Sequence, residues 1–325
     1  MKPPLLSARG LSVAYQTATG PVPACVDVDL TVRRGEILGI AGESGCGKST
    51  LVHALIRLAR PPATITDGQL LWYADGSAPV DLVPLPEKTL RSKRWTQLAI
   101  VLQSAMDALN PVTRLGTQFI DVLRVHDRSL SKAAAAARAA ELLGMVGIPA
   151  DRVRSFPHEM SGGMRQRATI ALALACGADL VVMDEPTTAV DVVMQRQILS
   201  QVLRLQDELD FAVVFVTHDL ALLLDFADRV AVMYAGRIVE TGTADQIRSQ
   251  PKHPYTRALR DSFPPLHGPR VRREGIAGAP ADLRRLPDGC AFHPRCPHAM
   301  PACVTDRPEL SGMDGQVACH LEERA

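Results

Sequence analysis

The sequence has few aromatic residues, almost no net charge and no apolar run long enough to cross a membrane. Aromatic residues make up 4% of the 325 residues, and 36 Lys and Arg nearly balance 35 Asp and Glu. The near-neutral charge argues against binding nucleic acid or an anionic membrane by bulk electrostatics. The shortage of aromatics argues against a base-stacking surface. No segment reaches the roughly 18 consecutive apolar residues of a spanning helix.

The start of the chain does not have the pattern of a secretory signal. The first ten residues hold two prolines and no long apolar run. We therefore expect a cytoplasmic protein, and any membrane role must come through a partner. Apolar residues at 46% are ordinary for a globular protein, and the length suggests about two domains.

Strand and helix patterns alternate along the chain. Short strands with turn signals are expected between Leu5 and Ile40. The alanine-rich block 133–137 predicts a helical insert between Leu109 and Pro149. Further strands are predicted at 37–41, 180–183, 213–216 and 230–233, and further helices at 48–57, 161–176 and 194–209. This alternation predicts an α/β fold with a mostly parallel sheet covered by helices. Residues 251–287, rich in Pro and Arg, are expected to form a linker.

A glycine-rich segment follows a predicted buried strand and precedes a predicted helix. Its residues are Gly42, Glu43, Ser44, Gly45, Cys46, Gly47, Lys48, Ser49 and Thr50, which fit the pattern G-x-x-x-x-G-K-[ST]. Glycines let such a loop turn its backbone N–H groups around phosphate oxygens, and the helix N-terminus adds partial positive charge. We expect Lys48 to reach the β- and γ-phosphates and Ser49 to bind Mg²⁺. The alternative is a chance glycine-rich turn.

Two acids end a second apolar strand. Four apolar residues, 180–183, are followed by Asp184 and Glu185. In an α/β sheet, ligands bind at the carboxyl ends of the strands. We expect Asp184 to hold Mg²⁺ and Glu185 to polarise the attacking water, which predicts hydrolysis of the γ-phosphate. Because many buried strands end in acids, this signal depends on the phosphate loop.

The segment before the Asp-Glu pair resembles the Leu-Ser-Gly-Gly-Gln signature of the ABC ATPases. Ser161, Gly162 and Gly163 match it, whereas Met160 and Met164 replace its first and last residues. The Met164 form, followed by Arg-Gln-Arg, is similar to one subunit type of the dipeptide and oligopeptide importers. A serine and two glycines at a helix start form a second anion-binding surface. The alternative is a plain helix cap.

Four more residues occur in the order that this family shows. They are Tyr15, Gln103, Asp191 and His218. The resemblance implies that Tyr15 stacks on adenine and that Gln103 senses Mg²⁺ and the attacking water. It implies that Asp191 belongs to the loop that crosses the dimer and that His218 contacts the γ-phosphate. The alternatives are a core or edge-strand tyrosine, a solvated loop amide and a structural histidine.

The resemblance covers the chain from about Leu5 to His320 and implies its organisation. It implies a P-loop NTPase fold of the ABC ATPase type, with a mostly parallel core sheet, an antiparallel β subdomain and a helical insert. Residues 1–245 would form the nucleotide-binding domain, with a helical subdomain at about 104–175. Residues 246–325 would form a linker and a small cysteine-rich module.

The resemblance also implies partners, because in ABC proteins the signature serine of one subunit completes the ATP site of the other. The Met164 form suggests that the second ATPase subunit is a paralogue, giving a heterodimer. Two transmembrane permease subunits would hold the pair at the cytoplasmic face of the inner or plasma membrane. An extracytoplasmic solute-binding protein would act indirectly, and no nucleic acid is expected as a partner.

Four of the seven cysteines, Cys290, Cys296, Cys303 and Cys319, crowd into the last 36 residues. In a reducing compartment such a cluster suggests a metal site before disulfides. Four thiolates suit either Zn²⁺ or an iron–sulfur cluster. The spacing lacks the C-x₂-C pairs usual for structural zinc, and the resemblance implies a [4Fe-4S] cluster, with zinc as the alternative. The nearby histidines are spare ligands or solvated loop residues: His293, His298 and His320.

We therefore expect an ATPase that energises uptake of di- or oligopeptides, with peptides inferred from the resemblance alone. Nickel chelates, sugars or opines remain alternative solutes. A soluble ABC ATPase acting on nucleic acid or ribosomes is a rival, but such proteins usually carry two ATPase halves or a coiled coil, and this chain shows one half and no heptad run. A P-loop kinase is disfavoured by Glu185 and by residues 161–167.

Overall fold

Contacts along the chain divide it into two units. A computed structural model describes residues 2–74, 78–103, 108–187, 191–262, 275–312 and 315–322. Residues 1–2 and 84–214 form one unit, called the helical unit below. Residues 3–83 and 215–325 form the other, called the sheet unit. Strand β8 (Ala212–Thr217) begins in the first unit and ends in the second.

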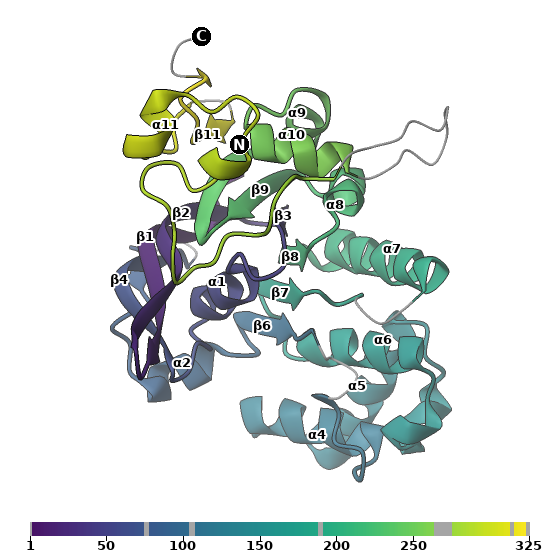
Figure 1. The fold of residues 1–325 in the computed structure, drawn as a ribbon. Helices are drawn as coiled ribbons and strands as arrows, with labels where there is room; N and C mark the ends of the chain where they lie inside the picture. The colour runs from purple at the N-terminus through teal and green to yellow at the C-terminus, as the bar shows by residue number, and fades with distance from the viewer. Residues whose placement is uncertain are drawn as a thin grey trace. The chain divides into compact units, whose positions relative to one another are not determined.

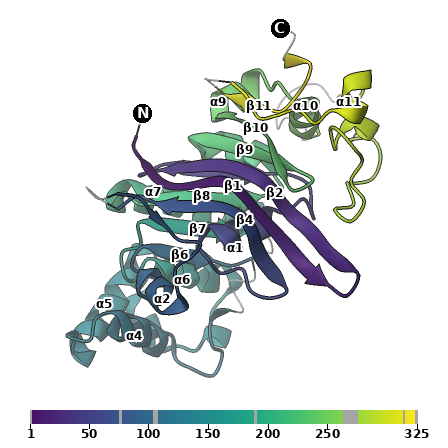
Figure 2. The ribbon, with the colours of Figure 1, turned by 90° about the vertical axis from the view of Figure 1, so that its left-hand side faces the viewer.

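The sheet unit contains an antiparallel sheet in the order β2-β1-β4-β5. Its strands are β1 (Pro4–Thr17), β2 (Gly20–Arg33), β4 (Ala63–Trp72) and β5 (Val80–Asp81). The long hairpin of β1 and β2 is visible in Figure 2, with Val13 opposite Cys25. Both arms are longer than the short strands that the pattern predicted. The register shifts along β1 explain the difference, because each irregularity interrupts the strict alternation of apolar and polar residues.

A second group of strands in this unit follows the order β11-β10-β9-β3. These strands are β3 (Ile37–Ala41), β9 (Arg229–Tyr234), β10 (Arg237–Thr243) and β11 (Gln316–Val317). β3 runs parallel to β9, whereas β10 is antiparallel to both β9 and β11. Among these four strands the directions are therefore mixed, because β10 and β11 add antiparallel pairs at the edge of the predicted mostly parallel sheet. The cause is the turn at Ala235 and Gly236, whose φ angles of 48° and 80° suit a tight hairpin that returns β10 beside β9.

The helices of the sheet unit include one that corrects a prediction. They are α1 (Lys48–Leu55), α8 (Leu220–Phe226), α9 (Ala244–Ser249), α10 (Pro254–Asp261) and α11 (Pro301–Thr305), with a 3₁₀ turn at His293–Arg295. α10 lies where a linker was expected. His253 caps it by accepting a hydrogen bond from the N–H of Tyr255 at 3.0 Å, and Tyr255 is fully buried. Packing therefore stabilises a helix that composition did not indicate. Residues 263–274 of the expected linker lie outside the described residues.

The helical unit contains the predicted helical insert. Its parallel strands are β6 (Leu98–Val101) and β7 (Leu180–Asp184). Its helices are α2 (Glu87–Lys93), α4 (Leu115–His126), α5 (Lys132–Met145), α6 (Gly162–Ala173) and α7 (Val192–Leu209), with 3₁₀ turns at Ala150–Arg154 and Pro157–Glu159. α4 and α5 lie side by side in Figure 1 and bury Phe119 and Leu143. α2 had no counterpart in the sequence prediction. Within the described residues, none of the helices combines the length and apolarity needed to traverse a bilayer.

Phe292 anchors the C-terminal segment of the sheet unit, which comprises the described residues 275–312 and 315–322. Its side chain is 2% exposed. Its ring lies 5.2 Å from the ring of Tyr234 and 5.4 Å from that of Tyr255, both in edge-to-face contact. Such pairs add to the stabilisation that burial of the ring already provides.

Replacing Phe292 with Ala is expected to lower the free energy of unfolding by about 3 to 5 kcal/mol, because truncation of a buried aromatic leaves a cavity. Urea denaturation measures the loss. Val304→Ala is the control, since Val304 belongs to the same segment but is 48% exposed. Equal losses in the two variants would contradict the anchoring role of Phe292.

Candidate functional site

The phosphate loop joins a buried strand to a helix, as the motif requires. All five residues of β3 are buried, and α1 begins at Lys48. Two glycines admit no other residue: a Cβ on Gly42 would lie 2.3 Å from the carbonyl oxygen of Met233, and one on Gly47 would lie 2.2 Å from that of Ala24. Gly47 also has a φ of 106°, a conformation that side chains disfavour. The sequence therefore specifies both the course of the loop and its close packing.

Lys48 is folded back onto the loop that precedes it. Its side chain is buried, and Nζ donates to the carbonyl oxygens of Gly42 at 2.8 Å and Glu43 at 3.0 Å. The loop thus surrounds an ammonium group at the N-terminal end of α1. The positive charge and the helix dipole act in the same direction there, so the position suits an anionic ligand.

Two further predicted residues belong to the same unit. Tyr15, on β1, is 37% exposed, and its Oη lies 2.9 Å from Oγ1 of Thr50 in a hydrogen bond. The structure therefore brings Tyr15 to the end of the phosphate loop, with an exposed ring. His218 is exposed and follows directly after β8. Its predicted contact with a γ-phosphate stays a prediction.

The helical unit brings Gln103 and Glu185 together. Asp184 is the last residue of β7 and is 2% exposed. Glu185 follows it with a φ of 45°, an uncommon conformation for a residue with a side chain. Nε2 of Gln103 donates to Oε2 of Glu185 at 3.0 Å. Backbone strain of this kind concentrates at functional sites, and the contact joins the predicted base to the predicted water-sensing amide.

The serine–glycine segment and Asp191 each begin a helix of this unit. Ser161 caps α6 by accepting a hydrogen bond from the N–H of Met164 at 3.3 Å. Asp191 caps α7 by accepting one from the N–H of Met194 at 2.9 Å. A Cβ on Gly163 would lie 2.4 Å from the sulfur of Met194. The two helix starts therefore pack against each other, and Ser161 and Asp191 are both exposed.

Two residues that no motif indicated hold Glu43 of the phosphate loop. The N–H of Glu43 donates to Oη of Tyr255 at 2.9 Å. The guanidinium of Arg295 donates to both carboxylate oxygens of Glu43, at 2.7 and 2.9 Å. Tyr255 and Arg295 lie 212 and 252 residues along the chain from Glu43. The only sequence signal near either was that Arg295 lies between two of the clustered cysteines.

The four clustered cysteines influence one another. Burial raises the pKa of Cys290 and Cys296 and raises that of Cys319 to about 11. Electrostatic repulsion from neighbouring thiolates of the cluster, including that of Cys303, raises these three pKa values further. Yet among the described residues, which include all four cysteines, no three His, Cys, Asp or Glu side chains form a group that could hold a metal ion. The predicted metal centre is therefore not supported by the side-chain positions.

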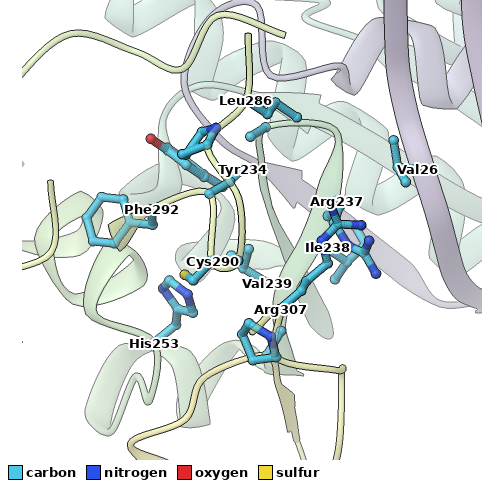
Figure 3. A pocket seen from close by; sticks show the side chains of 16 residues that line it. Val26, Tyr234, Arg237, Ile238, Val239, His253, Leu286, Cys290, Phe292 and Arg307 are labelled. Atoms are coloured by element: carbon cyan, nitrogen blue, oxygen red, sulfur yellow. The ribbon is translucent and has the colours of Figure 1, made fainter. Parts of the chain in front are cut away.

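A small cavity adjoins this cluster. Its volume is about 50 Å³, and its lining includes Cys290, Phe292, His253 and Tyr234, as Figure 3 shows. That volume admits only small molecules such as water. The cavity therefore cannot hold a nucleotide, and the phosphate loop remains the candidate for that role.

Comparisons with known proteins agree with these observations. Residues 25–188 match the ABC transporter family, and residues 239–303 match the family described as "Oligopeptide/dipeptide transporter, C-terminal region". The oligopeptide transport ATP-binding protein OppD of Bacillus subtilis is 44% identical over 94% of this chain and 85% of its own length. A putative peptide import ATP-binding protein of Brucella melitensis is 42% identical over 96% of this chain and 94% of its own.

A solved structure supports the same fold. A dimeric ATP-binding cassette in a post-hydrolysis state, bound to ADP and phosphate, superimposes with a TM-score of 0.65 and 26% identity. The match covers 74% of this chain and 99% of that one. The chain thus has the P-loop fold of an ABC ATPase, with mixed sheets, and by family and by relatives it belongs to the ABC transporters.

Proposed function

We propose that this chain is the ATP-hydrolysing subunit of an importer for di- or oligopeptides. The observation that carries the proposal is the phosphate loop, wrapped around the ammonium of Lys48 at the start of α1. The relatives named as oligopeptide, dipeptide or peptide import ATP-binding proteins match over 92 to 96% of this chain. Their match to residues beyond the phosphate loop favours the importer over a soluble ABC ATPase.

Different residues of the site bind the phosphates, the adenine and Mg²⁺. The loop from Gly42 to Thr50 binds the phosphates through its N–H groups and Lys48, and the exposed ring of Tyr15 stacks on the adenine. The motifs assign Ser49 and Asp184 to Mg²⁺, which would neutralise charge on the phosphates of ATP. The remaining roles fall to side chains at strand ends.

Glu185 accepts a proton from the attacking water, and Gln103 orients that water. The hydrogen bond of 3.0 Å between the two side chains supports this pairing, since it holds the carboxylate in one direction before substrate binds. His218 donates to the γ-phosphate. Because the acceptor is water, the products are ADP and inorganic phosphate, and no group of the protein is modified.

Each ATP site is completed by a second ATPase subunit. Ser161, Gly162 and Gly163 lie at the start of α6, where Ser161 is exposed and Gly163 is buried, and backbone N–H groups at a helix start suit an anion. We assign them to the γ-phosphate bound by the partner, and Asp191 to the contact between the two subunits. The partner is a paralogue, and the pair binds two permease subunits at the cytoplasmic face of the membrane, supplied by a solute-binding protein outside.

By the family resemblance, the four cysteines would hold a [4Fe-4S] group, with Zn²⁺ as the alternative, although the described side chains do not form a metal-binding group. The donor chemistry supports it, since Cys290, Cys296, Cys303 and Cys319 are soft ligands. A bound cation would lower the pKa values that burial raises, because it stabilises the thiolates. Such a group would cross-link a segment that has little apolar core of its own.

Glu185→Gln is expected to lower ATP turnover at least about 100-fold, because the amide cannot accept the proton of water. ATP binding should persist, and the ATP-bound dimer should stay closed. Steady-state phosphate release and size-exclusion chromatography with ATP measure the two effects. Glu141→Gln is the matched control, since Glu141 is an exposed residue of α5 in the same unit. Turnover of Glu185→Gln near the wild-type level would refute its assignment as base.

Uptake by cells tests the solute. A strain that lacks this chain is complemented with the wild type or with Lys48→Ala, and uptake of a labelled dipeptide, a labelled pentapeptide, Ni²⁺ and a disaccharide is measured. We expect the wild type alone to restore peptide uptake. Restoration of nickel or sugar uptake instead would replace the peptide assignment, and association with ribosomes without any uptake would favour the soluble ATPase.

Protein purified without oxygen is expected to be brown and to contain iron and inorganic sulfide. Cys303→Ser should lose both, because it removes one of four ligands. Cys176→Ser is the control, since Cys176 lies outside the cluster, in the helical unit. Zinc without iron would establish the alternative, and the absence of both metals would overturn the metal assignment.

A further inference from the structure

We propose that Arg295 is a positioning residue for ATP binding, which holds the phosphate loop in its binding conformation through Glu43. The inference rests on the proposed function, since it assumes that the loop binds the phosphates of ATP. It assigns to the C-terminal segment a role that a structural appendage would not have.

The ion pair itself is fixed in direction. Arg295 donates through Nη1 and Nη2 to separate carboxylate oxygens of Glu43, at 2.7 and 2.9 Å. The side chains are 7% and 20% exposed. Two parallel hydrogen bonds between planar groups specify geometry as well as energy, and limited exposure weakens screening by solvent.

Arg295 is also held in place by contacts other than those with Glu43. Nε donates to the carbonyl oxygen of Ala277 at 2.7 Å, and Nη1 also lies 3.3 Å from Oη of Tyr234. The guanidinium lies 5.9 Å from the ring centroids of both Tyr234 and Phe292. Since Phe292 is itself buried among aromatic rings, the guanidinium is a rigid support and not a flexible surface charge.

Glu43 passes this constraint to the phosphate loop. Its carboxylate binds Arg295, its N–H donates to Tyr255, and its carbonyl oxygen accepts from Nζ of Lys48 at 3.0 Å. All three polar parts of one residue are thus engaged. A backbone rotation at Glu43 that follows loss of Arg295 would displace the carbonyl that holds the lysine expected to reach the phosphates.

Positioning and simple electrostatics predict opposite results for one variant. Removing the carboxylate of Glu43 removes a negative charge from the loop, so by charge alone Glu43→Gln would bind ATP more tightly. If the carboxylate instead fixes the loop, Glu43→Gln weakens binding. Arg295→Gln weakens binding in both cases, because it loses the support and leaves a carboxylate near the anionic ligand.

The experiment measures the Kd of Mg-ATP by titration calorimetry, on the full chain carrying Glu185→Gln to suppress hydrolysis. We expect Arg295→Gln and Glu43→Gln each to raise Kd about tenfold, and the double variant to be no weaker than the worse single one, because the two residues act as a pair. In the assembled importer, KM for ATP should rise more than kcat falls. Exchange of the charges, Glu43→Arg with Arg295→Glu, should recover part of the affinity.

Arg229→Gln is the matched control. Arg229 pairs with buried Glu36 at 3.3 Å, and Glu36 directly precedes β3, at the end opposite to the phosphate loop. Its loss should lower stability without changing Kd. If Arg295→Gln does not fold, Glu43→Gln alone decides the question.

Tighter or unchanged binding by Glu43→Gln overturns the positioning role while the proposed function stands. Equal weakening by Arg229→Gln also overturns it, because the effect would then be general destabilisation. Failure of the wild type to bind Mg-ATP, or binding by Lys48→Ala equal to that of the wild type, overturns the proposed function instead.

Discussion

The ammonium of Lys48, held by the carbonyl oxygens of Gly42 and Glu43, is the interaction on which the phosphate loop depends. A buried ammonium is costly unless oxygens surround it, so the chain on both sides of residues 42–47 must turn inward. Gly42 and Gly47 permit that turn, since Met233 and Ala24 leave no room for a side chain at either position. One charged group thereby constrains the end of β3, the start of α1 and the neighbouring β9.

Elements set by local sequence were predicted well. α1 begins at Lys48 and α6 follows Ser161, as expected, because a cap or a glycine loop marks each start within a few residues. The antiparallel return of β10 was missed, since the turn that causes it places Ala235, a residue with no preference for positive φ, at its first position. α10 was missed because its stability comes from burial of Tyr255 and not from its Pro- and Arg-rich composition.

The residues of the candidate site also differ in whether the local sequence could predict them. Contiguous motifs predicted Lys48 and Asp184 as site residues, and the family resemblance predicted Gln103, whose Nε2 donates to Glu185 in the structure. Arg295 could not be found in this way, since its partner Glu43 lies 252 residues away. An arginine in a proline-rich segment gives no local sign that its side chain is enclosed by aromatic rings. Only the folded chain shows which charged side chain is a partner of the site.

Because Glu43 contacts both Lys48 and Arg295, nucleotide binding and the position of the C-terminal segment are thermodynamically coupled. If Arg295 favours the loop conformation that binds ATP, then ATP must favour the docked position of Arg295 by the same free energy, because coupling between two binding events is reciprocal. Arg295 directly precedes Cys296 and belongs to the turn His293–Arg295 that follows Cys290. Order imposed on that turn by nucleotide therefore extends to two of the four cysteines. The phosphate loop and the cysteine cluster are, on this argument, parts of one cooperative structure within the sheet unit.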